Sequence, residues 1–179
     1  EVADHVVKKP VTCPGAGYLE MARAAASFTA AGAATTLQGV FFLQPLSAND
    51  PGLHVECALS DGRFEVSSGI IGADASALKG ASTHCSGAFS GDARGGWQLV
   101  EHAATRGNVC VHIADVGGLY DGYHAVGLQY GPGYRTLVKA WSSSSTAAAR
   151  LQARSAWHGT QVHPADLDDA FCIGAFASS

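Results

Sequence analysis

Residues 14–28 constrain the fold more than any other segment, because they predict a helix that is apolar on nearly every side. Pro14 suits the first turn of such a helix, where its missing N–H group is not needed. Only Glu20 and Arg23 interrupt the apolar residues that follow. A helix of this kind is usually buried on most of its sides, so other parts of the chain must pack around it.

The segments after this helix have patterns typical of antiparallel strands. An apolar run covers residues 37–43, and apolar residues alternate with polar ones over residues 53–59. The Asp61–Gly62 dipeptide is a turn signal, and a strand pattern resumes over residues 63–71, so the pair predicts a hairpin. Residues 83–89 are a further strand candidate. A sheet wrapped around the single apolar helix is the simplest arrangement that buries both.

The second half of the chain predicts a second, unfinished unit. Residues 115–128 are a weak helix candidate because of their glycines. Residues 135–141 and 149–157 are predicted strands, joined by a turn at residues 142–145. Residues 164–176 predict another mostly apolar helix, and almost no sheet follows it.

Composition excludes several classes of protein. The chain has 15 acidic and 11 basic residues, and this formal charge of −4 argues against a nucleic-acid binder. No apolar run approaches the roughly 18 residues of a membrane span. The five cysteines are odd in number and have no Cys-x-x-Cys spacing, which favours a reducing, cytoplasmic compartment over a disulfide framework. The histidines and cysteines do not form a suitable ligand cluster. His54 and Cys57 would lie on opposite faces of a strand, and the adjacent His84 and Cys85 would also point apart, so no metal site is expected.

Taken singly, no residue identifies a chemistry. His5 could be a polar residue at a strand end, and Asp166, Asp168 and Asp169 could be charges that favour the start of a helix. The sequence has no P-loop, nucleophile elbow or convincing dinucleotide fingerprint.

Three segments become informative through their order. The first runs from His5 to Pro14 and continues as Pro-Gly-Ala-Gly-Tyr-Leu-Glu; the second is Tyr-Gly-Pro-Gly-Tyr at residues 130–134; the third is His-Pro-Ala-Asp-Leu-Asp-Asp-Ala-Phe-Cys at residues 163–172. Together they resemble the dehydratase domain of modular polyketide synthases and the related animal-type fatty acid synthase. That family has His-x-x-x-Gly-x-x-x-x-Pro before Gly-Ala-x-Tyr-Leu-Glu, then Tyr-Gly-Pro-x-Phe, then His-Pro-Ala-Leu-Leu-Asp-x-Ala-Leu-Gln/His.

The resemblance implies an α+β double hotdog, in which each of two antiparallel sheets wraps around a central apolar helix. The expected divisions are an N-terminal hotdog over residues 1–95, a linker and the start of the second half over residues 96–134, and the beginning of the C-terminal hotdog with its helix over residues 135–179. The second hotdog is then incomplete, and the chain is expected to be a fragment of something longer.

The implied reaction removes water from a 3-hydroxyacyl thioester to give a 2-enoyl thioester, with His5 as the base and Asp168 as the acid. No cofactor or metal is implied, because the substrate is carried on the phosphopantetheine arm of an acyl carrier protein. The other partners implied are neighbouring synthase domains and a homodimer. The supporting or tunnel-lining residues would be Pro14, Gly15, Tyr130, Gly131, Pro132 and Cys172.

This chemistry needs a neutral base and a protonated acid at one pH. Imidazole titrates near ~6.5, whereas a carboxylic acid starts near ~3.9 and must be raised by ~3 units. Burial and ionised neighbours at Asp166 and Asp169 would raise the pKa of Asp168, while the helix N-terminus would lower it. In the first helix, amides near Gly15 could stabilise negative charge on the thioester oxygen.

Two departures from the family pattern keep alternatives open. Lys9 stands at the motif glycine, and Cys172 stands where the family has Gln or His to hydrogen-bond the aspartate. A thiol is a poor hydrogen-bond donor. The alternatives are a degenerate, non-catalytic dehydratase-like structural module, and a double-hotdog isomerase or cyclase of the product-template type.

Overall fold

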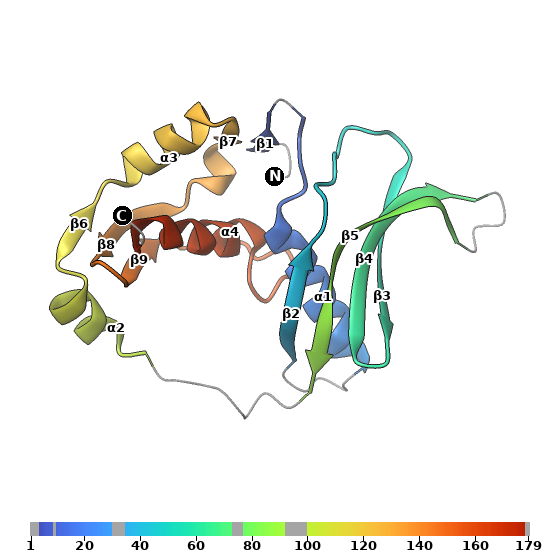
Figure 1. Ribbon diagram of the computed structural model, residues 1–179, viewed down its shortest axis with the longest axis horizontal. Coiled ribbons are helices and arrows are strands. Elements are labelled where there is room, and N and C mark those ends of the chain that lie inside the picture. Colours follow the sequence, from blue (N-terminus) through green and yellow to red (C-terminus); the bar gives the residue numbers. More distant parts are fainter. Residues whose placement is uncertain (1–3, 9, 30–34, 73–76, 92–99, 178–179) are drawn as a thin grey trace. The chain divides into compact units, whose positions relative to one another are not determined.

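The described residues of the chain form two compact units in a computed structural model (Figure 1). The N-terminal unit lies within residues 10–91, and the C-terminal unit combines residues 4–8 with residues 100–177. The N-terminal strand thus belongs with the second half of the chain, whereas the sequence analysis expected it within residues 1–95. Lys9 lies outside the described residues, which are 4–8, 10–29, 35–72, 77–91 and 100–177.

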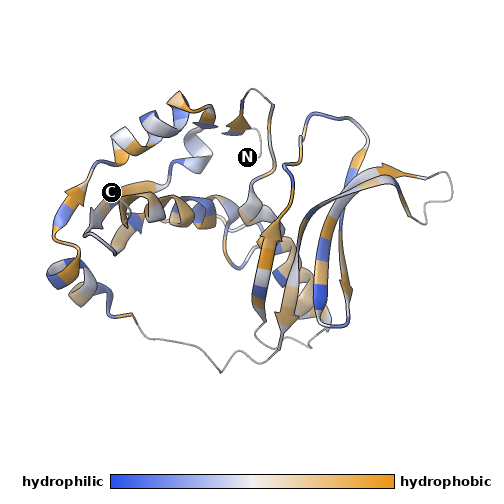
Figure 2. Ribbon diagram, viewed as in Figure 1, coloured by the Kyte–Doolittle hydropathy of each residue, from blue (hydrophilic) through white to orange (hydrophobic). Residues whose placement is uncertain are grey.

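Helix α1, Gly15–Thr29, is the centre of the N-terminal unit and confirms the predicted helix. Figure 2 shows it mostly in hydrophobic or neutral colours. Glu20 is buried although it is charged, and its two carboxylate oxygens accept hydrogen bonds of 2.7 Å from the Arg23 guanidinium. The two charged side chains of this otherwise apolar helix therefore pair with each other. The buried residues of the helix are Ala16, Tyr18, Glu20, Ala22 and Ala26.

The sheet of this unit has four antiparallel strands in the order β2-β5-β4-β3. The predicted hairpin is confirmed, because Ser60 lies opposite Arg63 across a two-residue loop. Asp61 and Gly62 both have positive φ angles, 50° and 72°, which is the conformation that two-residue hairpin loops prefer. The strands are β2 (Thr36–Phe42), β3 (Leu53–Ser60), β4 (Arg63–Ile71) and β5 (Leu78–Ser90).

The core of the unit lies between helix and sheet. Tyr18 and Ala22 of α1 share a buried cluster with Phe64 and Val66 of β4 and Cys85 of β5. Three of the buried residues of the helix are alanines, Ala16, Ala22 and Ala26, which leave room for the strands to pack against it. The predicted arrangement of one apolar helix against one antiparallel sheet is thereby confirmed for this unit.

The C-terminal unit contains two small antiparallel sheets, β1-β7 and β6-β8-β9. A turn of π-helix (Thr105–Val109) follows α2, and 3₁₀ turns cover Pro132–Tyr134 and Ile173–Ala177. The helices and strands are β1 (His5–Val7), α2 (His102–Ala104), β6 (His112–Ala114), α3 (Val116–Ala125), β7 (Leu128–Tyr130), β8 (Leu137–Ser142), β9 (Ala147–Leu151) and α4 (Pro164–Cys172).

Helix α4 begins where the sequence predicts. Pro164 is its first residue, and the His163 ring accepts a hydrogen bond of 3.2 Å from the Ala165 N–H at Nδ1. The α-helix ends at Cys172, and the rest of the predicted helix is a 3₁₀ turn. Phe171 is 54% exposed, so the helix is less enclosed than its apolar sequence suggests.

Two predicted elements of this unit have different ends. The strand predicted over residues 149–157 is wrong after Leu151. The Gln152 N–H still donates to the Thr136 carbonyl, but Arg154 then binds Asp166 and the Gly133 carbonyl, and the chain leaves the sheet. The helix predicted over residues 115–128 begins after Asp115, whose Oδ1 accepts a hydrogen bond from the Gly118 N–H, and it ends at Ala125. The predicted turn between β8 and β9 is confirmed.

All five cysteines are free. Within the described residues, no helix is both long enough and apolar enough to span a membrane.

The close approach of β4 and β5 at Gly87 yields a stability prediction. A Cβ atom at this position would lie 2.6 Å from Phe64 Cε1 and 3.2 Å from the Gln38 carbonyl oxygen. Phe64 is buried and cannot yield, so Gly87→Ala is expected to cost about 1–3 kcal/mol of unfolding free energy, measured by urea denaturation. Gly91→Ala is the control, since nothing lies within 4 Å of its added Cβ. Equal stabilities of the two variants would contradict this account of the core.

Candidate active site

The candidate site is organised by the pairing of two three-residue strands. Strand β1 pairs with β7 in antiparallel register, so that His5 lies opposite Tyr130. His5 is 8% exposed, and its ring centroid lies 5.5 Å from that of Tyr130 and 5.4 Å from that of Tyr134. The first and second sequence motifs are therefore in direct contact within one unit.

The glycines of the second motif have a steric role. The Gly131 N–H donates a hydrogen bond of 2.6 Å to the Asp4 carbonyl oxygen. A Cβ on Gly131 would lie 2.5 Å from Asp4 Oδ1, and one on Gly133 would lie 2.8 Å from Asp4 Oδ2. The turn therefore accommodates the carboxylate of the residue that precedes His5. Sequence reasoning missed Asp4, because nothing local connects it with a turn so far along the chain.

Asp168 lies on α4 with one buried oxygen, Oδ2, that has no hydrogen-bond partner among the described residues. Burial, the largest effect, raises the pKa of this carboxyl group above its ordinary value. The charge of His5 and the hydroxyl of Tyr130 lower the pKa, and the charge of Asp169 raises it. The net direction is upward, so the surroundings favour the protonated acid.

Cys172 follows Asp168 by one helical turn and lies against the same tyrosine. The Tyr130 hydroxyl is 3.6 Å from Cys172 Sγ. Burial raises the pKa of the Cys172 thiol and of the Tyr130 hydroxyl, and raises that of Tyr123 to about 12. These three groups are accordingly neutral near pH 7, and none of them adds a charge beside Asp168.

The three aspartates of α4 have three different surroundings. Asp166, the acidic residue of the first turn, pairs with Arg154 at 2.6 Å. Asp169 is completely buried and accepts hydrogen bonds, whereas Asp168 has the unpartnered oxygen described above. The sequence analysis placed all three in the first turn, but Asp168 and Asp169 lie beyond it.

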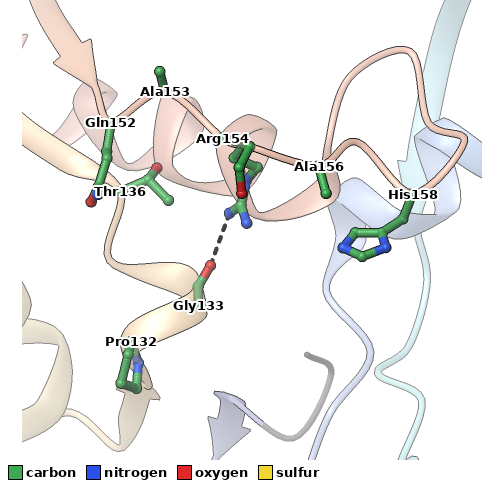
Figure 3. A pocket seen from close by; sticks show the side chains of 9 residues that line it. Pro132, Gly133, Thr136, Gln152, Ala153, Arg154, Ala156 and His158 are labelled. Atoms are coloured by element: carbon green, nitrogen blue, oxygen red, sulfur yellow. Dashed lines mark hydrogen bonds between the residues drawn. The ribbon is translucent and has the colours of Figure 1, made fainter.

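A cavity of about 250 Å³ adjoins the second motif (Figure 3). Pro132 and Gly133 line it together with Thr136, Arg154 and His158. Figure 3 shows the Arg154 guanidinium reaching the Gly133 carbonyl, a hydrogen bond of 2.9 Å. Pro132 is thus the one tunnel residue proposed from the sequence that lines this cavity; His5, Tyr130 and Asp168 do not.

The structure brings together some of the predicted site residues. His5, Tyr130, Asp168 and Cys172 gather in the C-terminal unit, and Gly131 and Pro132 continue from Tyr130. Pro14 and Gly15 belong to the N-terminal unit, at the start of α1. A Cβ on Gly15 would lie 2.9 Å from Phe42 Cε1, so this glycine permits close packing within its own unit.

Comparison with known families covers both units. Residues 2–69 match the family model described as polyketide synthase dehydratase domain, and residues 100–178 match the one described as polyketide synthase dehydratase N-terminal domain. Polyketide synthase ThaG of Burkholderia thailandensis is 34% identical over 176 residues, which cover 94% of this chain and 3% of that protein. The chain belongs to the polyketide synthase dehydratase family. The resemblance inferred from the three motifs is thereby confirmed.

Solved dehydratase structures have the same fold. The dehydratase domain from the CurF module of curacin polyketide synthase matches with a TM-score of 0.78 at 21% identity, over 98% of this chain and 65% of that one. Two CurK dehydratase variants described as inactive, one Asp-to-Asn and one His-to-Phe, match with TM-scores of 0.78 and 0.77 at 19% and 20% identity. They cover 98% of this chain and 63% of theirs. The predicted α+β double hotdog fold of this dehydratase chain is confirmed.

The raised pKa of Asp168 predicts a pH-dependent stability difference. A carboxyl group whose pKa is higher in the folded state stabilises the fold below its unfolded pKa and loses that contribution as pH rises through the folded pKa. Asn cannot ionise, so Asp168→Asn is expected to gain stability relative to the wild type as pH rises from 4 to 8. Urea denaturation across this range measures the difference, with the exposed Asp121→Asn as control. A difference that stays constant with pH would refute the upward shift.

Proposed function

We propose that this dehydratase chain catalyses the elimination of water from a 3-hydroxyacyl thioester, with His5 as base and Asp168 as acid. The observation that supports the proposal most directly is that Tyr130 lies beside both residues: its ring centroid is 5.5 Å from that of His5, and its hydroxyl is 3.6 Å from Cys172 Sγ, one helical turn after Asp168. Two aromatic rings pack on His5, and burial raises the pKa of Asp168, which is the direction that a general acid needs near neutral pH.

In the proposed step, a neutral imidazole nitrogen of His5 takes a proton from C2 of the substrate. The C2–H electron pair forms the double bond to C3 while the C3–O bond breaks. Asp168 gives its proton to the departing hydroxyl, which leaves as water. The enzyme ends with a protonated His5 and an ionised Asp168, and solvent exchange returns both to their starting states. The chain's own contribution is a carboxyl group whose pKa is raised by burial.

The substrate carrier and the neighbours of the chain belong to the same proposal. The chain spans 65% of the CurF dehydratase and 3% of ThaG, which is named a polyketide synthase. We infer that the acyl group arrives on an acyl carrier protein and that the neighbours are other synthase domains, in a dimeric assembly. The inactive Asp-to-Asn and His-to-Phe variants of CurK support a role for this pair of residue types.

A second candidate function is favoured by the surroundings of Cys172. The thiol stands where the family motif has Gln or His, and Asp168 Oδ2 has no hydrogen-bond partner among the described residues. A carboxyl group with one buried oxygen that lacks a donor would fit a module that has lost catalysis, or a double-hotdog isomerase or cyclase that uses the same pair differently. The experiment below separates these functions from dehydration.

The test of dehydration follows the mass of the acyl group. The chain within its full-length protein is incubated with a 3-hydroxybutyryl carrier-protein thioester, and loss of water is measured by mass spectrometry. His5→Ala and Asp168→Asn are each expected to lower the rate by about 10²–10⁴-fold, because each removes one proton-transfer group. His124→Ala and Asp121→Asn are matched controls, since both residues are exposed on α3 of the same unit.

The outcomes separate the candidates. Water loss that the site variants abolish and the control variants retain would support the dehydratase. Absence of water loss from a folded protein, with several acyl chain lengths, would overturn it. A product of unchanged mass with a moved double bond or a new ring would instead support the isomerase or cyclase.

A further inference from the structure

Asp169 is a completely buried carboxylate with three hydrogen-bond donors. The Tyr120 hydroxyl donates to Oδ1 at 2.8 Å, and Thr136 donates to Oδ2 from its backbone N–H at 2.5 Å and from its hydroxyl at 2.6 Å. All three groups give protons, which matches an ionised carboxylate that can only accept. Among the described residues, no lysine or arginine forms an ion pair with it. Its negative charge is therefore held by neutral donors.

These hydrogen bonds connect the elements that carry the proposed acid and position the proposed base. Asp169 is the next residue after Asp168 on α4, so fixing one side chain fixes the rotation of the helix that presents the other. Thr136 lies two residues after Tyr134, whose ring packs on His5. Tyr120 extends the connection to α3. The buried carboxylate of Asp169 thus links α4 to the segment whose Tyr134 packs on His5.

The charge of Asp169 also acts on its neighbour. It raises the pKa of Asp168, whereas Asp166 is neutralised by its pairing with Arg154. The hydroxyl and thiol groups beside Asp168 are neutral, so the charges that modify the pKa of Asp168, after the larger effect of burial, belong to His5 and Asp169. The titratable groups that act on Asp168 come from β1, β7, α3 and α4, and they are His5, Tyr130, Tyr123, Asp169 and Cys172.

We propose that Asp169 is a positioning residue for the dehydration described above: its buried carboxylate, held by Tyr120 and Thr136, orients α4 toward His5 and places a negative charge beside Asp168. The inference rests on the proposed function for its catalytic meaning. The effect of Asp169 on the titration of Asp168 can be measured without turnover, so it is tested separately from the proposed function.

The first experiment needs no substrate. In the full-length protein labelled with ¹³C-aspartate, the titration of the Asp168 carboxyl carbon is followed by NMR and assigned with Asp168→Asn. Asp169→Asn, which keeps the shape and removes the charge, is expected to move the Asp168 midpoint to lower pH. Asp166→Asn is the matched control on the same helix and is expected to leave it unmoved. An unmoved midpoint in folded Asp169→Asn would overturn the charge effect.

The second experiment measures kcat for water elimination against pH. Asp169→Asn is expected to lower kcat by roughly tenfold or more at pH 8 with little change in KM, and by less at pH 6, where a larger fraction of Asp168 is protonated. A kcat ratio that does not change with pH would show that Asp169 is a structural anchor only. If the wild type eliminates no water but the NMR midpoint moves, the proposed function fails, while the effect of Asp169 on the titration of Asp168 stands.

Thr136 supplies a second test if Asp169→Asn does not fold. Thr136→Ala removes one donor to Asp169 and leaves the backbone N–H, whereas Thr136→Ser keeps the hydroxyl. Thr136→Ala is expected to lower kcat several-fold at constant KM, and Thr136→Ser to stay within about twofold of the wild type. Equal kcat values for the two variants would overturn the positioning role.

Discussion

The pairing of β1 with β7 is the constraint on which the candidate site depends. It holds a three-residue strand near the N-terminus against the second motif, with His5 opposite Tyr130. Loop closure over so many residues costs conformational entropy, and three residues of ladder offer few hydrogen bonds to offset it. The additional contacts explain why the pairing persists. The Asp4 carbonyl accepts from Gly131, and Lys8 donates to the Gly127 carbonyl at 2.8 Å, so the strand is held at both ends.

The elements that local patterns define were predictable from the sequence. The α1 helix and the β3–β4 hairpin follow from an unbroken apolar run and from a two-residue turn signal. Strand β9 was predicted too long because Arg154 binds Asp166 and Gly133, and these tertiary contacts override the alternating pattern. The β1–β7 pairing has no local signal at all, since strands of three residues show no readable period.

The site residues were predictable only where a motif marked them. His5, Tyr130 and Asp168 came from the family resemblance, and the structure places them in one unit. Asp169 was noticed as a helix-start charge, yet its burial depends on donors from Tyr120 and Thr136, which lie far away in the sequence. A charged residue near the start of a helix is usually exposed, so nothing in the sequence indicated that Asp169 is completely buried.

A histidine and a carboxyl group that lie close together have two arrangements of one proton. The ion pair would leave the base protonated and the acid without its proton, so a dehydratase must keep the neutral pair. Burial disfavours both charges together. The unpartnered oxygen of Asp168 removes a hydrogen bond that would stabilise its anion, and the charge of Asp169 opposes ionisation further. The weak hydrogen-bond donor at Cys172 is therefore compatible with a protonated Asp168. A stronger donor at that position would stabilise the carboxylate and so favour the unproductive ion pair.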